Sequence, residues 1–408
     1  MSVIPKIRFK EFTDAWEQRK LGEVANYRRG SFPQPYGKSE WYAGEGAMPF
    51  VQVADVSDEM NLVEDTKQKI SKLAQPMSVL ADKNSVLVTL QGSIGRVAIT
   101  QYEAFIDRTV LIFEKYNIDI DNVFWAYIIK QKFIEEARKA PGGTIKTITK
   151  EALSDFDLSI PNYQEQKQIG VFLRNLDRLI TLHQRKCDET KDLKKYMLQK
   201  MFPKKGEKVP EIRFEGFTAD WEQRKLGEVF EQTAHFVNPN EEEIELWSLT
   251  VEGGLTSKTE RYNREFLVKK DNNFKEVRPG EIVYNPMNMT LGAVGYNGMT
   301  KSVAVSGYYT TMIAKNGHDS YYVNTWLKSP QAISLYKTFA TGSLIEKQRV
   351  QYSTLSVIPA AFPKHEEQVK IGKLFSSLDN LITLHQRKCD SLKELKKFML
   401  QNMFPKEK

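Results

Sequence analysis

Two histidine and cysteine pairs are the first residues of this 408-residue sequence whose types and spacing could do chemistry. His183 stands four residues before Cys187, and His385 stands four residues before Cys389. Histidine and cysteine act as catalytic groups or metal ligands when further ligands or nucleophiles lie near them. Neither pair has such neighbours in the sequence, and no C-x-x-C spacing occurs, so we interpret all four as packing residues.

Two further motifs resemble functional patterns only in part. Residues 285–288 read Asn-Pro-Met-Asn, which departs from the Asn/Asp-Pro-Pro-aromatic motif of amino-methyltransferases, and we expect a turn there. Residues 92–95 read Gly-Ser-Ile-Gly without the Lys-Ser/Thr that completes a phosphate-binding loop, so they predict a hairpin turn. No carboxylates have the spacing of a nuclease metal site. The sequence therefore shows no catalytic, metal-binding or cofactor-binding motif.

The charge is distributed unevenly along the chain. The sequence has a pI near 9.0 and a net charge of +7. Residues 25–160 hold 16 basic and 18 acidic residues, residues 230–362 hold 13 of each, and the remainder holds 30 basic and 21 acidic. No apolar run approaches the ~20 residues of a membrane span, the first residues lack a signal-peptide core, and the two cysteines suit a reducing compartment. We expect a soluble cytoplasmic protein.

Two blocks of sequence occur twice. Residues 4–24, IPKIRFKEFTDAWEQRKLGEV, return as residues 209–229, VPEIRFEGFTADWEQRKLGEV, which places Trp16 and Trp221 at matching positions. The string LITLHQRKCD at residues 179–188 returns at residues 381–390. The chain is therefore an internal tandem repeat of two nearly equal halves.

The two segments between the repeats, 25–160 and 230–362, resemble each other only in pattern. Ser85–Val88 precedes a glycine-containing turn at 92–95, and Gly280–Val283 precedes a similar turn at 291–294. Each pattern predicts a strand, a turn and a second strand. We infer two copies of one α+β domain that present different surfaces on a shared frame.

A helical pattern follows each domain. Prolines 161 and 203 bracket the first segment and prolines 363 and 405 the second, so each helix should have about 35 residues and a length of about 50 Å. Apolar residues at alternating three- and four-residue steps predict a coiled-coil seam. Since the halves are repeats, a pseudo-two-fold axis would pair the helices antiparallel. The predicted seam residues are Ile169, Phe172, Leu176, Leu179, His183, Leu193, Met197, Ile371, Leu374, Leu378, Leu381, His385, Leu392, Leu395 and Met399.

The arrangement resembles the specificity subunit of Type I restriction-modification systems. The resemblance rests on the two unlike domains between near-identical helices, on the WEQRKLGE strings at Trp16 and Trp221, and on the domain exits. Those exits are Ser159-Ile160-Pro161 with Glu165-Gln166, and Val357-Ile358-Pro359 with Glu367-Gln368. The resemblance implies two target-recognition domains, at 1–160 and 206–362, and two repeat helices, at 161–205 and 363–408.

The resemblance also implies the function. Each target-recognition domain would read one half of an asymmetric bipartite sequence in double-stranded DNA, and the helices would set the gap between the halves. The chain itself would be non-catalytic. It would assemble with two methyltransferase subunits that use S-adenosylmethionine and with motor-nuclease subunits that use ATP and Mg²⁺. The outer helix faces and the segments at Trp16 and Trp221 are our candidates for docking the methyltransferase subunits.

Base reading requires Arg, Lys, Asn or Gln in fixed positions, and phosphate contacts also use Ser, Thr and Tyr. The glycine-containing loops supply these types. Our candidates for DNA binding are Gln91, Ser93, Arg96, Arg108, Thr144, Lys146, Asn288, Tyr308, Tyr309, Ser343, Lys347, Gln348 and Arg349. Two other readings remain open at this point, namely a structural adaptor that joins other proteins through its coiled coil, and an enzyme whose site lies unrecognised in one variable domain.

Overall fold

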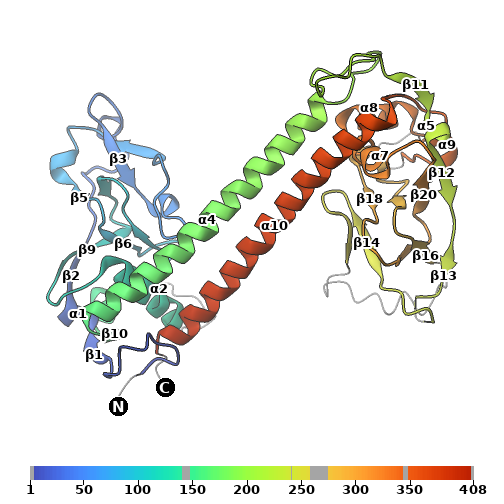
Figure 1. Ribbon diagram of the computed structural model, residues 1–408. Coiled ribbons are helices and arrows are strands. Elements are labelled where there is room, and N and C mark those ends of the chain that lie inside the picture. Colours follow the sequence, from blue (N-terminus) through green and yellow to red (C-terminus); the bar gives the residue numbers. More distant parts are fainter. Residues whose placement is uncertain (1–3, 140–147, 240, 258–273, 343–347, 406–408) are drawn as a thin grey trace. The chain divides into compact units, whose positions relative to one another are not determined.

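The computed structural model describes residues 4–139, 148–239, 241–257, 274–342 and 348–405. The chain divides into two compact units, Met1–His183 with Arg387–Lys408, and Gln184–Gln386. Each unit holds one globular head and a stretch of both long helices, α4 (Tyr163–Lys200) and α10 (His365–Met403) (Figure 1). They are called the first and second unit below.

The head of the first unit is built on the four-stranded sheet β2-β9-β6-β7, with a second sheet β4-β3-β8-β5 and the strand pair β1-β10. Its strands are β1 (Glu17–Lys20), β2 (Ala25–Arg29), β3 (Met48–Val51), β4 (Gln68–Ile70), β5 (Val79–Ala81), β6 (Val86–Thr89), β7 (Val97–Ile99), β8 (Ala104–Ile106), β9 (Val110–Tyr116) and β10 (Asp157–Ile160). Its helices are α1 (Leu21–Val24), α2 (Asn122–Lys139) and α3 (Lys150–Ser154).

The head of the second unit is built on the sheet β12-β20-β17-β18, with β13-β16-β19 and the pairs β14-β15 and β11-β21. Its strands are β11 (Glu222–Lys225), β12 (Phe230–Thr233), β13 (Phe236–Val237), β14 (Trp247–Thr250), β15 (Gly254–Ser257), β16 (Phe274–Val277), β17 (Ile282–Tyr284), β18 (Val294–Tyr296), β19 (Val303–Ser306), β20 (Thr310–Ala314) and β21 (Pro359–Phe362). Its helices are α5 (Leu226–Val229), α7 (Ser320–Leu327), α8 (Pro330–Phe339) and α9 (Tyr352–Ser356), with a 3-10 turn η5 (Met289–Leu291).

The two four-stranded sheets have the same order of strands. In the first unit β6 pairs antiparallel with β7, and in the second unit β17 pairs antiparallel with β18. The outer strand of each sheet, β2 or β12, directly follows the repeated WEQRKLGE segment. The predicted strand, turn and strand in each half are confirmed, and so is the expectation of two similar α+β domains.

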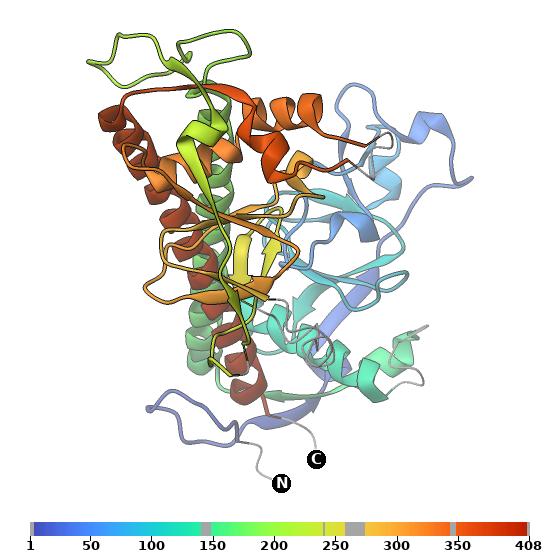
Figure 2. The same cartoon turned by 90° about the vertical axis from the view of Figure 1, so that its right-hand side faces the viewer.

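The two long helices pack antiparallel, as predicted. They contain 38 and 39 residues, and each begins two residues after the proline expected to precede it. In the first unit Asp177 of α4 forms an ion pair with Lys396 of α10. In the second unit Lys194 of α4 pairs with Asp379 of α10 at 2.5 Å. Within the second unit alone, Cys187 lies beside Ile382 and Lys194 pairs with Asp379, so residue numbers fall along α10 as they rise along α4 (Figure 2).

The contact between the helices is centred on the row of residues 173, 180 and 187 of α4 and not on the predicted seam beside it. Leu173 and Cys187 are fully buried, and the Sγ atoms of Cys187 and Cys389 approach carbonyls of the opposite helix, Ile382 O at 3.8 Å and Ile180 O at 3.9 Å. Of the predicted seam residues, Ile169, Leu176, Ile371, Leu378 and Leu392 are buried; Phe172, His183, Met197, Leu374, His385 and Met399 are half-buried; Leu179, Leu193, Leu381 and Leu395 are exposed. The placement of those four exposed leucines in the seam is corrected, because a residue next to the 173–180–187 row is rotated about 100° from it.

The repeated tryptophans belong to the cores of the heads. Trp16 is 3% exposed and Trp221 is 1% exposed. Each indole packs edge-to-face on a phenylalanine just after the end of a long helix, Phe404 at 6.2 Å and Phe202 at 6.4 Å between ring centroids. The expectation that Trp16 and Trp221 dock a partner is therefore wrong for the rings themselves, since a ring closed off from solvent cannot contact another protein.

Candidate nucleic-acid interface

In the first unit, the ends of three strands meet at one edge of the main sheet. The N–H of Leu90, which follows β6, donates to the carbonyl of Thr109 at 2.8 Å, and the N–H of Gly30, which follows β2, donates to Val110 O at 2.9 Å. The β6–β7 loop, the end of β2 and the β8–β9 turn therefore lie together. Gln91 and Arg108 are carried on this edge.

The predicted DNA-binding residues of the first unit differ in their availability. Gln91, Ser93 and Arg108 are exposed. Arg96 is half-buried and engaged, because its Nε pairs with Asp58 at 3.1 Å and its Nη1 donates to Val56 O at 3.4 Å. Arg96 therefore holds the β6–β7 loop in place. Two further candidates, Thr144 and Lys146, lie outside the described residues.

In the second unit, the equivalent edge is formed by the β17–β18 loop, the β19–β20 turn and the segment at 348–350. The N–H of Val350 donates to Pro286 O at 3.0 Å, which brings that segment beside the β17–β18 loop. Asn288, Tyr308 and Arg349 are exposed on this edge. Tyr309 and Gln348 are half-buried, and Ser343 and Lys347 lie outside the described residues.

The matching loops of the two heads carry different chemistry. The β6–β7 loop offers Gln91 where the β17–β18 loop offers Asn288, and the β8–β9 turn offers Arg108 where the β19–β20 turn offers Tyr308. Amide and guanidinium groups of this kind hydrogen-bond to base edges and phosphates. The two edges therefore present different hydrogen-bonding groups.

Sequence reasoning missed two arginines at the same edge of the first unit. A cleft of about 210 Å³ lies there and includes Arg28, Arg29, Leu90 and Ile148 in its lining. Arg29 Nη2 donates to the carbonyl of Ile148 at 3.3 Å, and Arg28 Nε forms an ion pair with Glu114 at 2.5 Å. The signal was present in the sequence, as two adjacent arginines at the end of the first strand after the repeat, but nothing there indicated that this strand end meets the β6–β7 loop.

The Glu-Gln motif after each head has a structural role that the repeat explains. Glu165 is fully buried and accepts two hydrogen bonds from Arg8, at 2.7 and 2.8 Å. Glu367 is equally buried and accepts the same two bonds from Arg213. The hydrogen bond to Glu165 raises the pKa of Arg8 above its ordinary value, so the Arg8 guanidinium stays charged. We call these two contacts the arginine clamps.

The neighbouring glutamine completes each attachment. Gln166 Nε2 donates to Pro161 O at 2.9 Å and to Asp119 O at 3.2 Å. Gln368 Nε2 donates to Pro363 O at 2.8 Å and lies 3.3 Å from His318 Nδ1. Each glutamine thus fastens the first turn of a long helix to the segment that precedes α2 or α7.

A second attachment links each head to both long helices. Tyr127 of α2 donates its hydroxyl to Asp177, which also pairs with Lys396. Burial raises the pKa of Tyr127 well above its ordinary value, and the nearby Asp177 carboxylate adds to that shift. The phenol therefore stays protonated and able to donate at neutral pH.

The second unit makes the same contact from a different position. Tyr321 of α7 donates to Asp379 at 2.6 Å, and Asp379 pairs with Lys194. The contacted aspartates and lysines occupy matching positions in the repeat, but the tyrosines do not. Tyr127 stands six residues after the aspartate that caps its helix, Asp121, whereas Tyr321 stands two residues after its capping aspartate, Asp319. The two heads therefore make the same contact from different positions of their helices.

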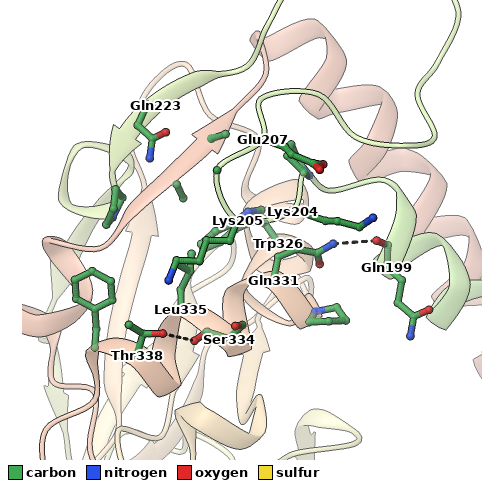
Figure 3. A pocket seen from close by; sticks show the side chains of 17 residues that line it. Gln199, Lys204, Lys205, Glu207, Gln223, Trp326, Gln331, Ser334, Leu335 and Thr338 are labelled. Carbon is green, nitrogen blue, oxygen red and sulfur yellow. Dashed lines mark hydrogen bonds between the residues drawn. The ribbon is translucent and has the colours of Figure 1, made fainter.

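The heads also differ where β10 and β21 approach the ends of the helices. In the second unit a cavity of about 650 Å³ lies between the end of α4, α8 and β21 (Figure 3). Its wall is held by Gln331, whose Nε2 donates to Gln199 O at 2.9 Å. Its apolar lining includes Trp326, Leu335 and Phe339, and its polar lining includes Lys204, Lys205, Glu207, Ser334 and Thr338.

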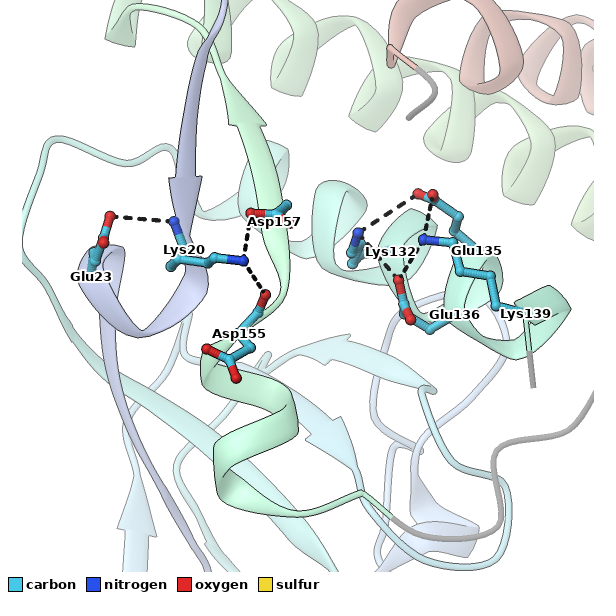
Figure 4. Close-up of polar contacts among 8 residues, drawn as sticks. All are labelled: Lys20, Glu23, Lys132, Glu135, Glu136, Lys139, Asp155 and Asp157. Atoms are coloured by element: carbon cyan, nitrogen blue, oxygen red, sulfur yellow. Dashed lines mark hydrogen bonds and ion pairs between the residues drawn. The ribbon is translucent and has the colours of Figure 1, made fainter. Parts of the chain in front are cut away.

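The corresponding place in the first unit is nearly filled. The space there is about 50 Å³, and Lys132 on its rim is held at 3.2 Å from Glu136 and 4.0 Å from Glu135 (Figure 4). Lys139 pairs with the same two glutamates. These ion pairs link neighbouring turns of α2 and stabilise that helix. Within the described residues, no group of three or more His, Cys, Asp or Glu is placed to hold a metal ion.

Comparison with known proteins places this geometry in a family. Residues 13–191 and 218–394 each match the family described as the Type I restriction modification DNA specificity domain. These two matches cover most of the chain, so the protein belongs to this family. No described helix is long and apolar enough to cross a membrane.

Individual relatives support this family assignment. The chain is 25% identical over 221 residues, 52% of its length, to the Type I restriction enzyme MjaVIII specificity subunit of Methanocaldococcus jannaschii. It is 25% identical over 180 residues to the EcoR124I/EcoR124II specificity subunit of Escherichia coli. The matches cover 49% and 43% of those proteins, so the chain spans about half the length of the curated relatives it matches. The crystal structure of the S subunit from M. genitalium has the same fold, with a TM-score of 0.65 and 16% identity over 99% of this chain and 100% of that one.

Proposed function

We propose that this chain is the non-catalytic DNA-specificity subunit of a Type I restriction-modification complex. Each head reads one half of a bipartite site in double-stranded DNA. The observation that carries the proposal is the pair of equivalent sheet edges, which are built on the same strand order and present Gln91 and Arg108 in one head but Asn288 and Tyr308 in the other. Two unlike edges require two unlike half-sites, so the site is asymmetric.

The paired helices set the gap between the half-sites. Their register is fixed in each unit by an interhelical ion pair, Asp177 with Lys396 and Lys194 with Asp379. The arginine clamps then fasten each head to the start of a helix. A helical pair of about 50 Å is long enough to hold two reading surfaces one turn of B-DNA apart, about 34–36 Å.

The outer faces of the helices are the surfaces for two methyltransferase subunits. Large apolar side chains are exposed there at repeat-related positions, Leu182 and Leu384, and Tyr196 and Phe398. Such side chains favour burial against a partner. The partner subunits would methylate adenine with S-adenosylmethionine, and motor-nuclease subunits using ATP and Mg²⁺ would complete the complex in the cytoplasm.

Sequencing of methylated adenines tests the reading role. The chain is co-expressed with the methyltransferase encoded beside it, and modified adenines are mapped across the host genome. We expect one gapped, asymmetric motif that disappears when the chain is omitted. Methylation without a gapped motif would favour the adaptor reading and would contradict this proposal.

A helix insertion tests the spacing role. Seven residues, about two helical turns, are inserted at matching points in α4 and α10. We expect both half-sites to stay the same and the gap between them to grow. An unchanged gap in a folded, active variant would remove the spacing role and leave the reading role intact.

A further inference from the structure

The reading edge of the first unit carries an exposed aromatic ring that is firmly held from behind. Tyr36, on the segment after β2, is 50% exposed. Its ring packs on buried Phe32 at 4.8 Å between centroids, and Phe32 in turn stacks on Tyr42 at 5.3 Å. Because the ring is backed by other rings, little conformational freedom would be lost when it contacts a ligand.

A cationic side chain lies over this ring. The guanidinium carbon of Arg108 is 5.5 Å from the ring centroid of Tyr36, within the range of a cation–π contact. The turn that carries Arg108 is fixed by Asp107, whose Oδ1 accepts from the N–H and the hydroxyl of Thr109 at 3.0 and 2.6 Å. Across the described part of the chain, no carboxylate forms an ion pair with Arg108, so its charge is available to an anion.

The second unit has a matching pair. Phe236, on the segment after β12, is 61% exposed. The Nζ of Lys275, its partner across β13 and β16, lies 5.7 Å from the ring centroid. The same Nζ donates to Tyr309 O at 2.8 Å, which ties the pair to the β19–β20 turn. As with Arg108, no described carboxylate neutralises Lys275.

Two features separate these pairs from scattered surface residues. Both rings follow the first strand of the main sheet and lie beside equivalent turns, β8–β9 and β19–β20. The cations come from different elements, a turn in one unit and a strand in the other, so simple duplication does not account for both. A single exposed aromatic residue needs no explanation, but the same ring and cation combination at both reading edges does.

We propose that Tyr36 with Arg108, and Phe236 with Lys275, are DNA contacts in which the ring packs against a base step and the cation binds the adjacent phosphate. The inference rests on the proposed reading function and names residues for it. Aromatic and apolar side chains that insert at base steps partly unstack them, and lysine and arginine supply the phosphate contacts that position a protein on the duplex. Each head would thereby sense how easily its half-site deforms as well as which base edges it presents.

The test replaces each ring with an aliphatic side chain. Tyr36→Leu and Phe236→Leu are compared with Tyr163→Leu, which alters a tyrosine that is 41% exposed at the start of α4. The probe is a DNA duplex with the motif found by methylation sequencing, and it carries 2-aminopurine in one half-site or the other. We expect about tenfold weaker binding for each ring variant and loss of the fluorescence change in one half-site only. Tyr36→Phe and Phe236→Tyr should keep both signals.

The outcomes separate the inference from the function it rests on. If the wild-type chain gives no gapped motif, the proposed function fails first. If the wild-type chain gives the motif but both ring variants bind as tightly as Tyr163→Leu, the ring contacts are refuted. They are also refuted if each folded ring variant weakens binding to both half-sites equally.

If a leucine variant unfolds, Arg108→Gln and Lys275→Gln test the cations instead. Each should reduce the salt dependence of binding by about one phosphate contact, and an unchanged salt slope overturns the proposal.

Discussion

The first and second units can be compared contact by contact, because the repeat supplies both with the same attachments. The arginine clamp of Arg8 and Glu165 is reproduced by Arg213 and Glu367 with the same two hydrogen bonds. The reading edges do not match in the same way, since Arg108 in one turn corresponds to Tyr308 in the other. The parts that hold a head on the helices are therefore the same in both units, whereas the parts that face the proposed DNA differ.

The tyrosine contacts show how far a head can change while remaining attached. Asp177 and Asp379 are repeat copies, but the tyrosines that reach them, Tyr127 and Tyr321, stand at different positions of α2 and α7. The two positions are four residues apart once the helices are aligned on their capping aspartates, which is about one helical turn. A residue on the same helical face can therefore replace its neighbour at this contact.

Breaking an arginine clamp should have the largest effect on stability, and it should be the same in both units. Arg8→Ala leaves the buried Glu165 without its partner, and Arg213→Ala does so for Glu367, which should lower the free energy of unfolding by about 3–5 kcal/mol. Hydrogen exchange on the full chain assigns the loss to one unit. Arg19→Ala, which breaks an exposed pair with Glu17, is the control and should cost less than about 1 kcal/mol. A clamp variant no less stable than this control would show that the shared frame does not depend on the clamps.

Changes at the reading edges should affect the units separately. Gln91→Ala and Asn288→Ala each remove an exposed amide, which should reduce binding to the cognate site by about 1–3 kcal/mol and relax one half-site only. Methylation sequencing with each variant shows which half-site has relaxed. Relaxation of both half-sites by a single variant would contradict the separate roles of the two heads.

The smallest effect is expected at the tyrosine contacts. Tyr127→Phe and Tyr321→Phe remove one hydrogen bond to Asp177 or Asp379 and leave the ion pairs with Lys396 and Lys194, so each should cost about 0.5–1.5 kcal/mol. Thermal unfolding measures the loss, with Tyr196→Phe on an exposed face as the control. If only one of the two variants is destabilised, the tyrosines are not equivalent contacts, and this attachment is not shared by the two units.

The sequence predicted the elements that depend on local pattern. The bracketing prolines gave the ends of α4 and α10 within two or three residues, because proline restricts the helix where it stands. The strand, turn and strand pattern before Gly92–Gly95 predicted β6 and β7, since alternation and turn residues are local signals.

What the sequence did not predict depends on contacts between distant residues. Arg96 was expected to face DNA, but Asp58, 38 positions earlier, holds it. Trp16 was expected at a docking surface, but it packs against Phe404 from the far end of the chain. Tyr36 was not noticed, because its exposure and its neighbour Arg108 follow from how two loops meet. Charge and residue type alone do not distinguish an engaged side chain from an available one.

Duplicating one head tests whether each head reads its half-site independently of the other. Residues 230–362 are replaced by a second copy of residues 25–160, and methylated adenines are sequenced in cells that carry this chain and its methyltransferase. If the repeat supplies only the frame and each head reads for itself, the motif becomes a gapped inverted repeat of the first half-site. Survival of the original asymmetric motif would contradict the account, and so would a folded, assembled chain that directs methylation to no symmetric motif.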